Sequence, residues 1–131
     1  MAGYPGRMNT MHVLFVDDET EFLELVSKRL ARRGIEVTTA SSGEAGLEAA
    51  RTARFDVVVL DVKMPGMDGL ETLRHLRKLT PTTPVLLLTG HASLGAALNG
   101  MEAGAFDYML KPVAINELIM KLTEAVRLGN S

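Results

Sequence analysis

The chain has 131 residues, of which 47% are hydrophobic, and a formal net charge of -2 at pH 7. These values are typical of one folded domain and exclude a largely disordered chain. The 14 lysines and arginines are scattered, so nucleic-acid binding is not expected. There is no cysteine, which excludes disulfides and thiolate metal sites. No apolar run is long enough to span a bilayer, so membrane insertion is not expected. We therefore expect a soluble cytoplasmic domain.

The hydrophobic pattern changes repeatedly between the period of a strand and the period of a helix. The first half of the chain predicts a strand at residues 12–16, a helix at 19–33, a strand at 35–40, a helix at 44–53 and a strand at 57–60. The second half predicts a helix after Asp68, a strand at 84–88, a helix at 94–103, a strand at 105–109 and a last helix from Ile115. Ser41 and Glu44 have the spacing of a capping box for the second helix, and Asp68 can cap the third.

Five alternating strand–helix units, with no repeat and no long linker, predict a doubly wound α/β fold in which helices cover both faces of a parallel sheet. Ligands bind such folds beyond the carboxyl ends of the strands. Four of the five expected strands lead into chemically useful side chains at that edge: Asp17 with Asp18, Asp61, Thr89 and Lys111. Each alone has an ordinary explanation as a cap, turn or surface residue, but their joint placement predicts one site.

The chemistry of this edge favours a divalent cation. Two carboxylates about 4 Å apart repel each other by roughly 4 kcal/mol at an effective dielectric of about 20, so protons or a cation must compensate. Oxygen ligands without a nearby histidine or cysteine suit Mg²⁺, which Mn²⁺ could replace. Lys111 would add a positive charge that suits a phosphoryl oxygen.

Four segments carry a family resemblance: VDDE at 16–19, LDVKMPGMDG at 60–69, LLLTGHA at 86–92 and GAFDYMLKP at 104–112. In this order and at these spacings they resemble the receiver domain of bacterial two-component response regulators, the CheY-like family. The resemblance covers about residues 11–128, which leaves a flexible leader at 1–10 and a tail at 129–131. It implies a flavodoxin-like three-layer sandwich with strand order 2-1-3-4-5 and five helices.

The resemblance implies a role for each residue at the predicted edge. Asp61 is the expected phosphoacceptor. Asp18 is the expected direct ligand of Mg²⁺, and Asp17 is expected to act through water. The backbone carbonyl of Lys63 is the expected third protein ligand.

Three further residues follow from the same resemblance. The hydroxyl of Thr89 and the ammonium of Lys111 are expected to contact the phosphoryl group. Tyr108 is the expected switch aromatic, which turns inward on activation. A cis peptide bond is expected between Lys111 and Pro112.

The function implied is a phosphorylation switch. Asp61 would accept a phosphoryl group from the phosphohistidine of a sensor histidine kinase, and the face made by the fourth helix, fifth strand and fifth helix would then change shape. That face would control an output domain or partner protein, with a homodimer through it as one output. Gly95 and Gly100 in the fourth helix either weaken it for this change or allow close packing. Beyond self-catalysed phosphorylation and dephosphorylation, no enzyme activity is expected.

Three other functions compete with this one. A phosphohydrolase of the haloacid-dehalogenase type also uses Asp, Mg²⁺, Thr and Lys, but it separates its two acids by one residue, whereas Asp17 and Asp18 are adjacent. A receiver-like module that binds partners without phosphorylation would not need all five site residues. A nucleotide-binding module is disfavoured because no glycine-rich loop follows the first strand. The chain itself is expected to be a stand-alone receiver or the N-terminal part of a larger regulator, with some similarity to enhancer-binding transcription regulators.

Overall fold

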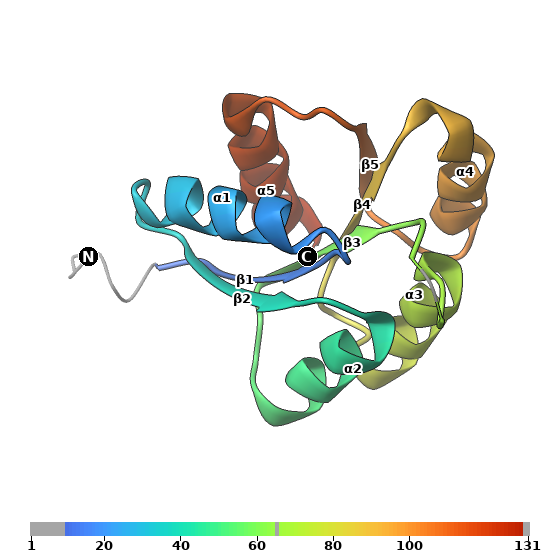
Figure 1. Ribbon diagram of the computed structural model, residues 1–131. Coiled ribbons are helices and arrows are strands. Elements are labelled where there is room, and N and C mark those ends of the chain that lie inside the picture. Colours follow the sequence, from blue (N-terminus) through green and yellow to red (C-terminus); the bar gives the residue numbers. More distant parts are fainter. Residues whose placement is uncertain (1–9, 65, 130–131) are drawn as a thin grey trace.

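The computed structural model describes residues 10–64 and 66–129, in which five strands alternate with five α-helices (Figure 1). The strands are β1 (His12–Val16), β2 (Glu36–Ala40), β3 (Val57–Asp61), β4 (Val85–Thr89) and β5 (Asp107–Leu110). The helices are α1 (Thr20–Ala31), α2 (Gly43–Thr52), α3 (Gly69–Leu79), α4 (Leu94–Glu102), preceded by the short 3-10 helix η2 (His91–Ser93), and α5 (Ile115–Gly129). The expected leader and tail fall almost wholly outside the described residues.

All the strands pair in parallel in the order β2-β1-β3-β4-β5, which confirms the predicted fold class and strand order. Helices α1 and α5 cover one face of the sheet, and α2, α3 and α4 cover the other (Figure 1). Every residue of β3 and β4 is buried because these strands lie inside the sheet with helices on both sides. Alternate side chains of β3 therefore enter the two different cores.

The predicted elements are present with small shifts at their ends. β4 begins at Val85 and not at Pro84, because a proline has no N–H to donate to a neighbouring strand. Asp68 caps α3 as predicted, and its Oδ1 accepts the N–H of Glu71 at 2.9 Å. None of the described helices combines the length and the apolar character that crossing a bilayer requires.

The predicted capping box of the second helix is wrong by one residue. Ser42, and not Ser41, is the N-cap of α2, and its Oγ accepts the N–H of Ala45 at 3.0 Å. The capping-box spacing to Glu44 favours Ser41, but an adjacent serine can also cap a helix, and this local signal does not decide the helix start. The burial of Leu47 and Ala50 against the sheet sets the helix register and so selects Ser42.

The two glycines of α4 have different surroundings. A Cβ on Gly100 would lie 2.4 Å from Leu87 Cδ1, so this glycine lets the helix pack closely on β4. A Cβ on Gly95 would meet no atom within 4 Å. Close packing thus accounts for Gly100, whereas Gly95 only lowers the intrinsic helix propensity of α4.

Candidate functional site

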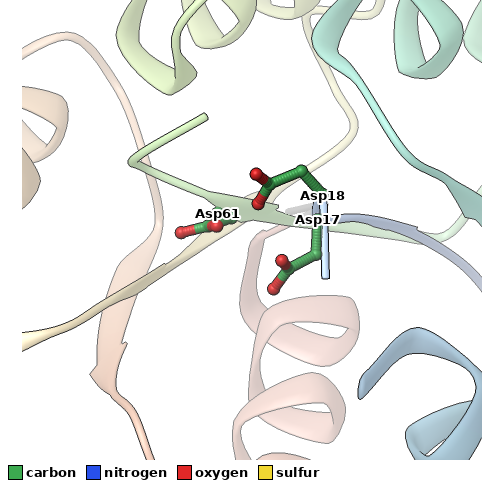
Figure 2. A group of neighbouring side chains, drawn as sticks. All are labelled: Asp17, Asp18 and Asp61. Carbon is green, nitrogen blue, oxygen red and sulfur yellow. The ribbon is translucent and has the colours of Figure 1, made fainter. Parts of the chain in front are cut away.

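Three aspartates meet at the carboxyl edge of the sheet (Figure 2). Asp17 follows β1, and its backbone N–H donates to the carbonyl of Ala40 at the end of β2. Asp61 is the last residue of β3. Asp17 and Asp61 are buried and Asp18 is exposed, yet one carboxylate oxygen of each lies within 4.8 Å of the other two. The parallel topology thus gathers three acids that are far apart in sequence.

The ammonium of Lys111 lies among carboxylates at the same edge. Its Nζ is 2.8 Å from Asp17 Oδ2, 3.7 Å from Asp61 Oδ2 and 2.6 Å from Glu19 Oε1. The backbone N–H of Lys111 donates to the carbonyl of Thr89 at 2.7 Å, which fixes the loop after β5 to the end of β4. The peptide bond between Lys111 and Pro112 is cis. In the sequence, Glu19 is only the last residue of the VDDE motif and the first of a predicted helix, and its contact with Lys111 is visible only in the structure.

Burial and neighbouring charges shift the pKa values of both Asp61 and Lys111. Burial, reinforced by the charge of Asp17, raises the pKa of Asp61 from 3.8 to about 6, although Lys111 and the N–H of Lys63 oppose that rise. Burial by itself would lower the pKa of the Lys111 ammonium, but the contacts with Asp17 and Glu19 outweigh burial and raise that pKa above its ordinary value. A proton at neutral pH is thus held much more firmly by Lys111 than by Asp61.

The donor set fits a hard divalent cation. Asp17 Oδ2 is buried, and no donor in the described part of the chain meets it with hydrogen-bond geometry. The Lys111 ammonium forms an ion pair with that oxygen at 2.8 Å. This single positive charge also lies near the carboxylates of Glu19 and Asp61, so it cannot neutralise all three acids. Since all the candidate ligands are carboxylate or carbonyl oxygens, the residues present fit Mg²⁺ or Mn²⁺.

The remaining predicted site residues lie at or near the same edge with other contacts. Thr89 is buried at the end of β4, and its hydroxyl donates to the carbonyl of Gly90 at 3.1 Å. The N–H of Lys63 donates to Asp61 Oδ1 at 3.2 Å. Tyr108 is half-buried in β5, where it pairs with Leu87 of β4. The structure therefore brings Lys63 to Asp61 directly, and gives Thr89 and Tyr108 partners outside the acidic group.

The raised pKa of Asp61 predicts a pH-dependent stability. The folded state holds this proton more tightly than the unfolded chain, so the group stabilises the fold most below pH 3.8 and loses that contribution as pH rises to about 6. Without divalent cation, Asp61→Asn should therefore raise the free energy of unfolding by about 1–2 kcal/mol at pH 7 and by clearly less at pH 4. Urea denaturation of both proteins in EDTA at the two pH values measures this difference. An equal gain at both pH values would contradict it.

Residues 13–123 match the family model of the response regulator receiver domain. The chain belongs to this family. It is similar to the probable transcriptional regulatory protein TcrX of Mycobacterium tuberculosis, with 44% identity over 115 residues that cover 88% of this chain and 49% of that protein. It is also similar to the uncharacterized transcriptional regulatory protein YkoG of Bacillus subtilis, with 40% identity over 120 residues, 92% of this chain and 53% of that protein.

A solved receiver domain from Clostridium thermocellum superposes with a TM-score of 0.85 at 38% identity, covering 89% of this chain and 94% of that one. The resemblance drawn from the four motifs is thus confirmed, and the receiver assignment prevails over the haloacid-dehalogenase alternative. This receiver domain of two-component response regulators spans about half the length of the two curated relatives.

Proposed function

We propose that this receiver domain is switched by phosphorylation of Asp61. The supporting observation is that the carboxylate of Asp61 lies at the end of a central strand, with the Lys111 ammonium and the acids Asp17 and Asp18 beside it. The N–H of Lys63 holds Oδ1, which leaves Oδ2, on the side of Lys111, as the attacking oxygen.

The donor is a phosphohistidine of a sensor histidine kinase. Asp61 Oδ2 attacks the phosphorus, the phosphorus–nitrogen bond breaks, and its electron pair stays on the imidazole nitrogen of the kinase. The product is an acyl phosphate on Asp61, and later attack by water on its phosphorus returns the carboxylate and inorganic phosphate. Lys111 neutralises charge on a phosphoryl oxygen, so the residues act mainly by position and electrostatics. We expect no further enzyme activity from this domain.

Asp17, Asp18, Asp61 and the carbonyl of Lys63 would hold Mg²⁺ in this site. When bound, Mg²⁺ would neutralise the crowded carboxylates and the oxygens of the phosphoryl group. From the resemblance to the family, we assign Asp18, the exposed member of the group, as the direct ligand, with Asp17 acting through water.

Phosphorylation is proposed to reach a partner through α4, β5 and α5. The Thr89 hydroxyl now donates to Gly90, and it would have to leave that carbonyl to contact a phosphoryl oxygen. Its movement would open space for Tyr108, which is half-buried and would then turn inward. The α4-β5-α5 face then controls an output domain or partner protein, with dimerisation through this face as one output. The relatives named above are transcriptional regulatory proteins. We therefore propose that residues 11–128 are the receiver of a longer cytoplasmic protein that controls transcription.

Phosphoramidate tests the proposed chemistry because it carries a phosphorus–nitrogen bond like that of phosphohistidine. With Mg²⁺, the domain should gain the mass of one phosphoryl group, and hydroxylamine should remove it, since hydroxylamine cleaves acyl phosphates. No mass gain with phosphoramidate or acetyl phosphate would refute the proposal.

Removal of the Asp18 carboxylate should weaken Mg²⁺ binding strongly. We expect Asp18→Ala to lower the affinity by about 10- to 100-fold, because one of few charged ligands is lost. Titration with Mg²⁺, followed by calorimetry or by amide NMR shifts, measures the affinity. Glu24→Ala, which removes an exposed carboxylate farther along α1, is the control. An unchanged affinity in Asp18→Ala would remove Asp18 from the ligand set.

A further inference from the structure

The carboxylate nearest to the Lys111 ammonium does not belong to Asp61. Nζ lies 2.6 Å from Glu19 Oε1 but 3.7 Å from Asp61 Oδ2, beyond hydrogen-bond distance. Lys111 and Glu19 are 92 residues apart in sequence, so the contact links the loop after β5 to the start of α1. In this state the ammonium is drawn toward α1 and away from the residue that we propose is phosphorylated.

The backbone of Glu19 is held firmly in place. Its N–H donates to Asp17 Oδ1 at 2.9 Å, and its carbonyl accepts the N–H of Leu23 at 3.0 Å in the first turn of α1. Glu19 occupies the N-cap position, yet its side chain accepts no capping hydrogen bond from the helix. The carboxylate is therefore available to bind Lys111, and helix capping does not explain its position.

An aromatic ring supports the same position of Lys111. Nζ lies 5.0 Å from the centroid of the Phe22 ring, which is within the range of a cation–π interaction. The Phe22 ring makes an edge contact with Phe15 in the core, with centroids 5.8 Å apart. Glu19 and Phe22, both from the start of α1, thus hold the ammonium on one side of the site, together with Asp17, whose Oδ2 lies 2.8 Å from Nζ.

We propose that Glu19 is a positioning residue that competes with the phosphoryl group for Lys111. This inference rests on the proposed phosphorylation of Asp61. In the unphosphorylated domain Glu19 keeps the ammonium on the α1 side, and Lys111 exchanges that contact for a phosphoryl oxygen when Asp61 is modified. Glu19 therefore favours the unphosphorylated state, and its removal shifts the equilibrium toward the phosphorylated state.

Beryllofluoride with Mg²⁺ is the probe, because it imitates a phosphoryl group on a carboxylate and reports an equilibrium affinity. Glu19→Gln should bind it about two- to fivefold more tightly than the wild type, which is the range of a solvent-exposed ion pair. Glu19→Asp keeps the charge but is one methylene too short for the 2.6 Å contact, so it should also bind more tightly. Glu21→Gln removes an exposed charge two residues farther along, in the first turn of α1, and should leave the affinity unchanged.

A double variant shows whether Glu19 acts through Lys111. In a Lys111→Met background, Glu19→Gln should have no effect on beryllofluoride affinity. A second readout needs no phosphoryl mimic: in ¹⁵N NMR of lysine side chains, the Lys111 ammonium should exchange its protons slowly in the wild type and faster in Glu19→Gln.

The outcomes separate the two proposals. If beryllofluoride does not bind the wild type, the proposed phosphorylation of Asp61 is wrong, and the role of Glu19 is wrong with it. If it binds the wild type and Glu19→Gln equally, or if the Glu19→Gln effect persists without Lys111, only the role of Glu19 is overturned. If Glu19→Asp behaves as the wild type while Glu19→Gln binds tighter, the effect is one of net charge, which also overturns the positioning role.

Discussion

Asp61→Asn will abolish the uptake of phosphate from acetyl phosphate, whereas the wild type will gain one hydroxylamine-sensitive phosphoryl group. An amide oxygen carries no full negative charge and is a poor nucleophile toward phosphorus, so the loss should be complete within detection. Intact-mass spectrometry of both proteins, incubated with the donor and Mg²⁺, measures the difference. The same substitution is expected to stabilise the fold at neutral pH without metal, so unfolding would not explain the loss.

Asp56→Asn is the matched control for this experiment. Asp56 immediately precedes β3, at the opposite end of the same strand, and its side chain accepts the N–H of His12 at 2.8 Å. This substitution should leave phosphorylation intact, because Asp56 lies at the amino edge of the sheet, away from Asp61. A hydroxylamine-sensitive phosphate on Asp61→Asn would show that another residue is the acceptor.

The sequence predicts most of the fold because strand ends and helix caps are local signals. Four apolar residues before Asp61 predict a buried strand, and Asp68 predicts the start of the following helix; the structure confirms both. The parallel topology then requires Asp61, Asp17 and the loop of Lys111 to meet at one edge. This part of the site follows from the pattern of elements alone.

Contacts that depend on side-chain reach could not be predicted in the same way. Nothing in the motif VDDE distinguishes a solvated Glu19 from one that binds Lys111, because the distance between them depends on how the loop after β5 folds back toward α1. The choice of Ser42 over Ser41 also needs the structure, because it depends on how α2 packs against the sheet. The raised pKa of Asp61 also needs the structure, since burial is its largest cause.

Gly69 is a further residue whose importance is visible only in three dimensions. It is the first residue of α3, and its N–H donates to the carbonyl of Val62 at 3.0 Å. A Cβ at this position would lie 2.5 Å from Val62 Cα and 2.6 Å from the carbonyl oxygen of Asp61. These are backbone atoms, and no rotamer change can relieve the contact. The start of α3 therefore packs directly against the end of the strand that carries the candidate site.

Gly69→Ala should consequently destabilise the domain and distort the site together. We expect a loss of about 3 kcal/mol in the free energy of unfolding, at the upper end of overpacking costs, because strand β3 or helix α3 must shift. Urea denaturation measures the stability, and Mg²⁺ titration measures the effect at Asp61. Gly95→Ala is the control: a Cβ there meets no atom within 4 Å, so the substitution should stabilise α4 by about 0.5–1 kcal/mol.

The two readouts on Gly69→Ala separate a local from a global effect. If the backbone at Asp61 moves, Mg²⁺ affinity should fall even at temperatures where the variant is fully folded, because carboxylate ligands must keep their spacing to share one ion. A variant that lost stability but bound Mg²⁺ as the wild type does would show that α3 gives way and the end of β3 stays in place. An unchanged stability would mean that the close approach of α3 to Val62 is not a constraint on this fold.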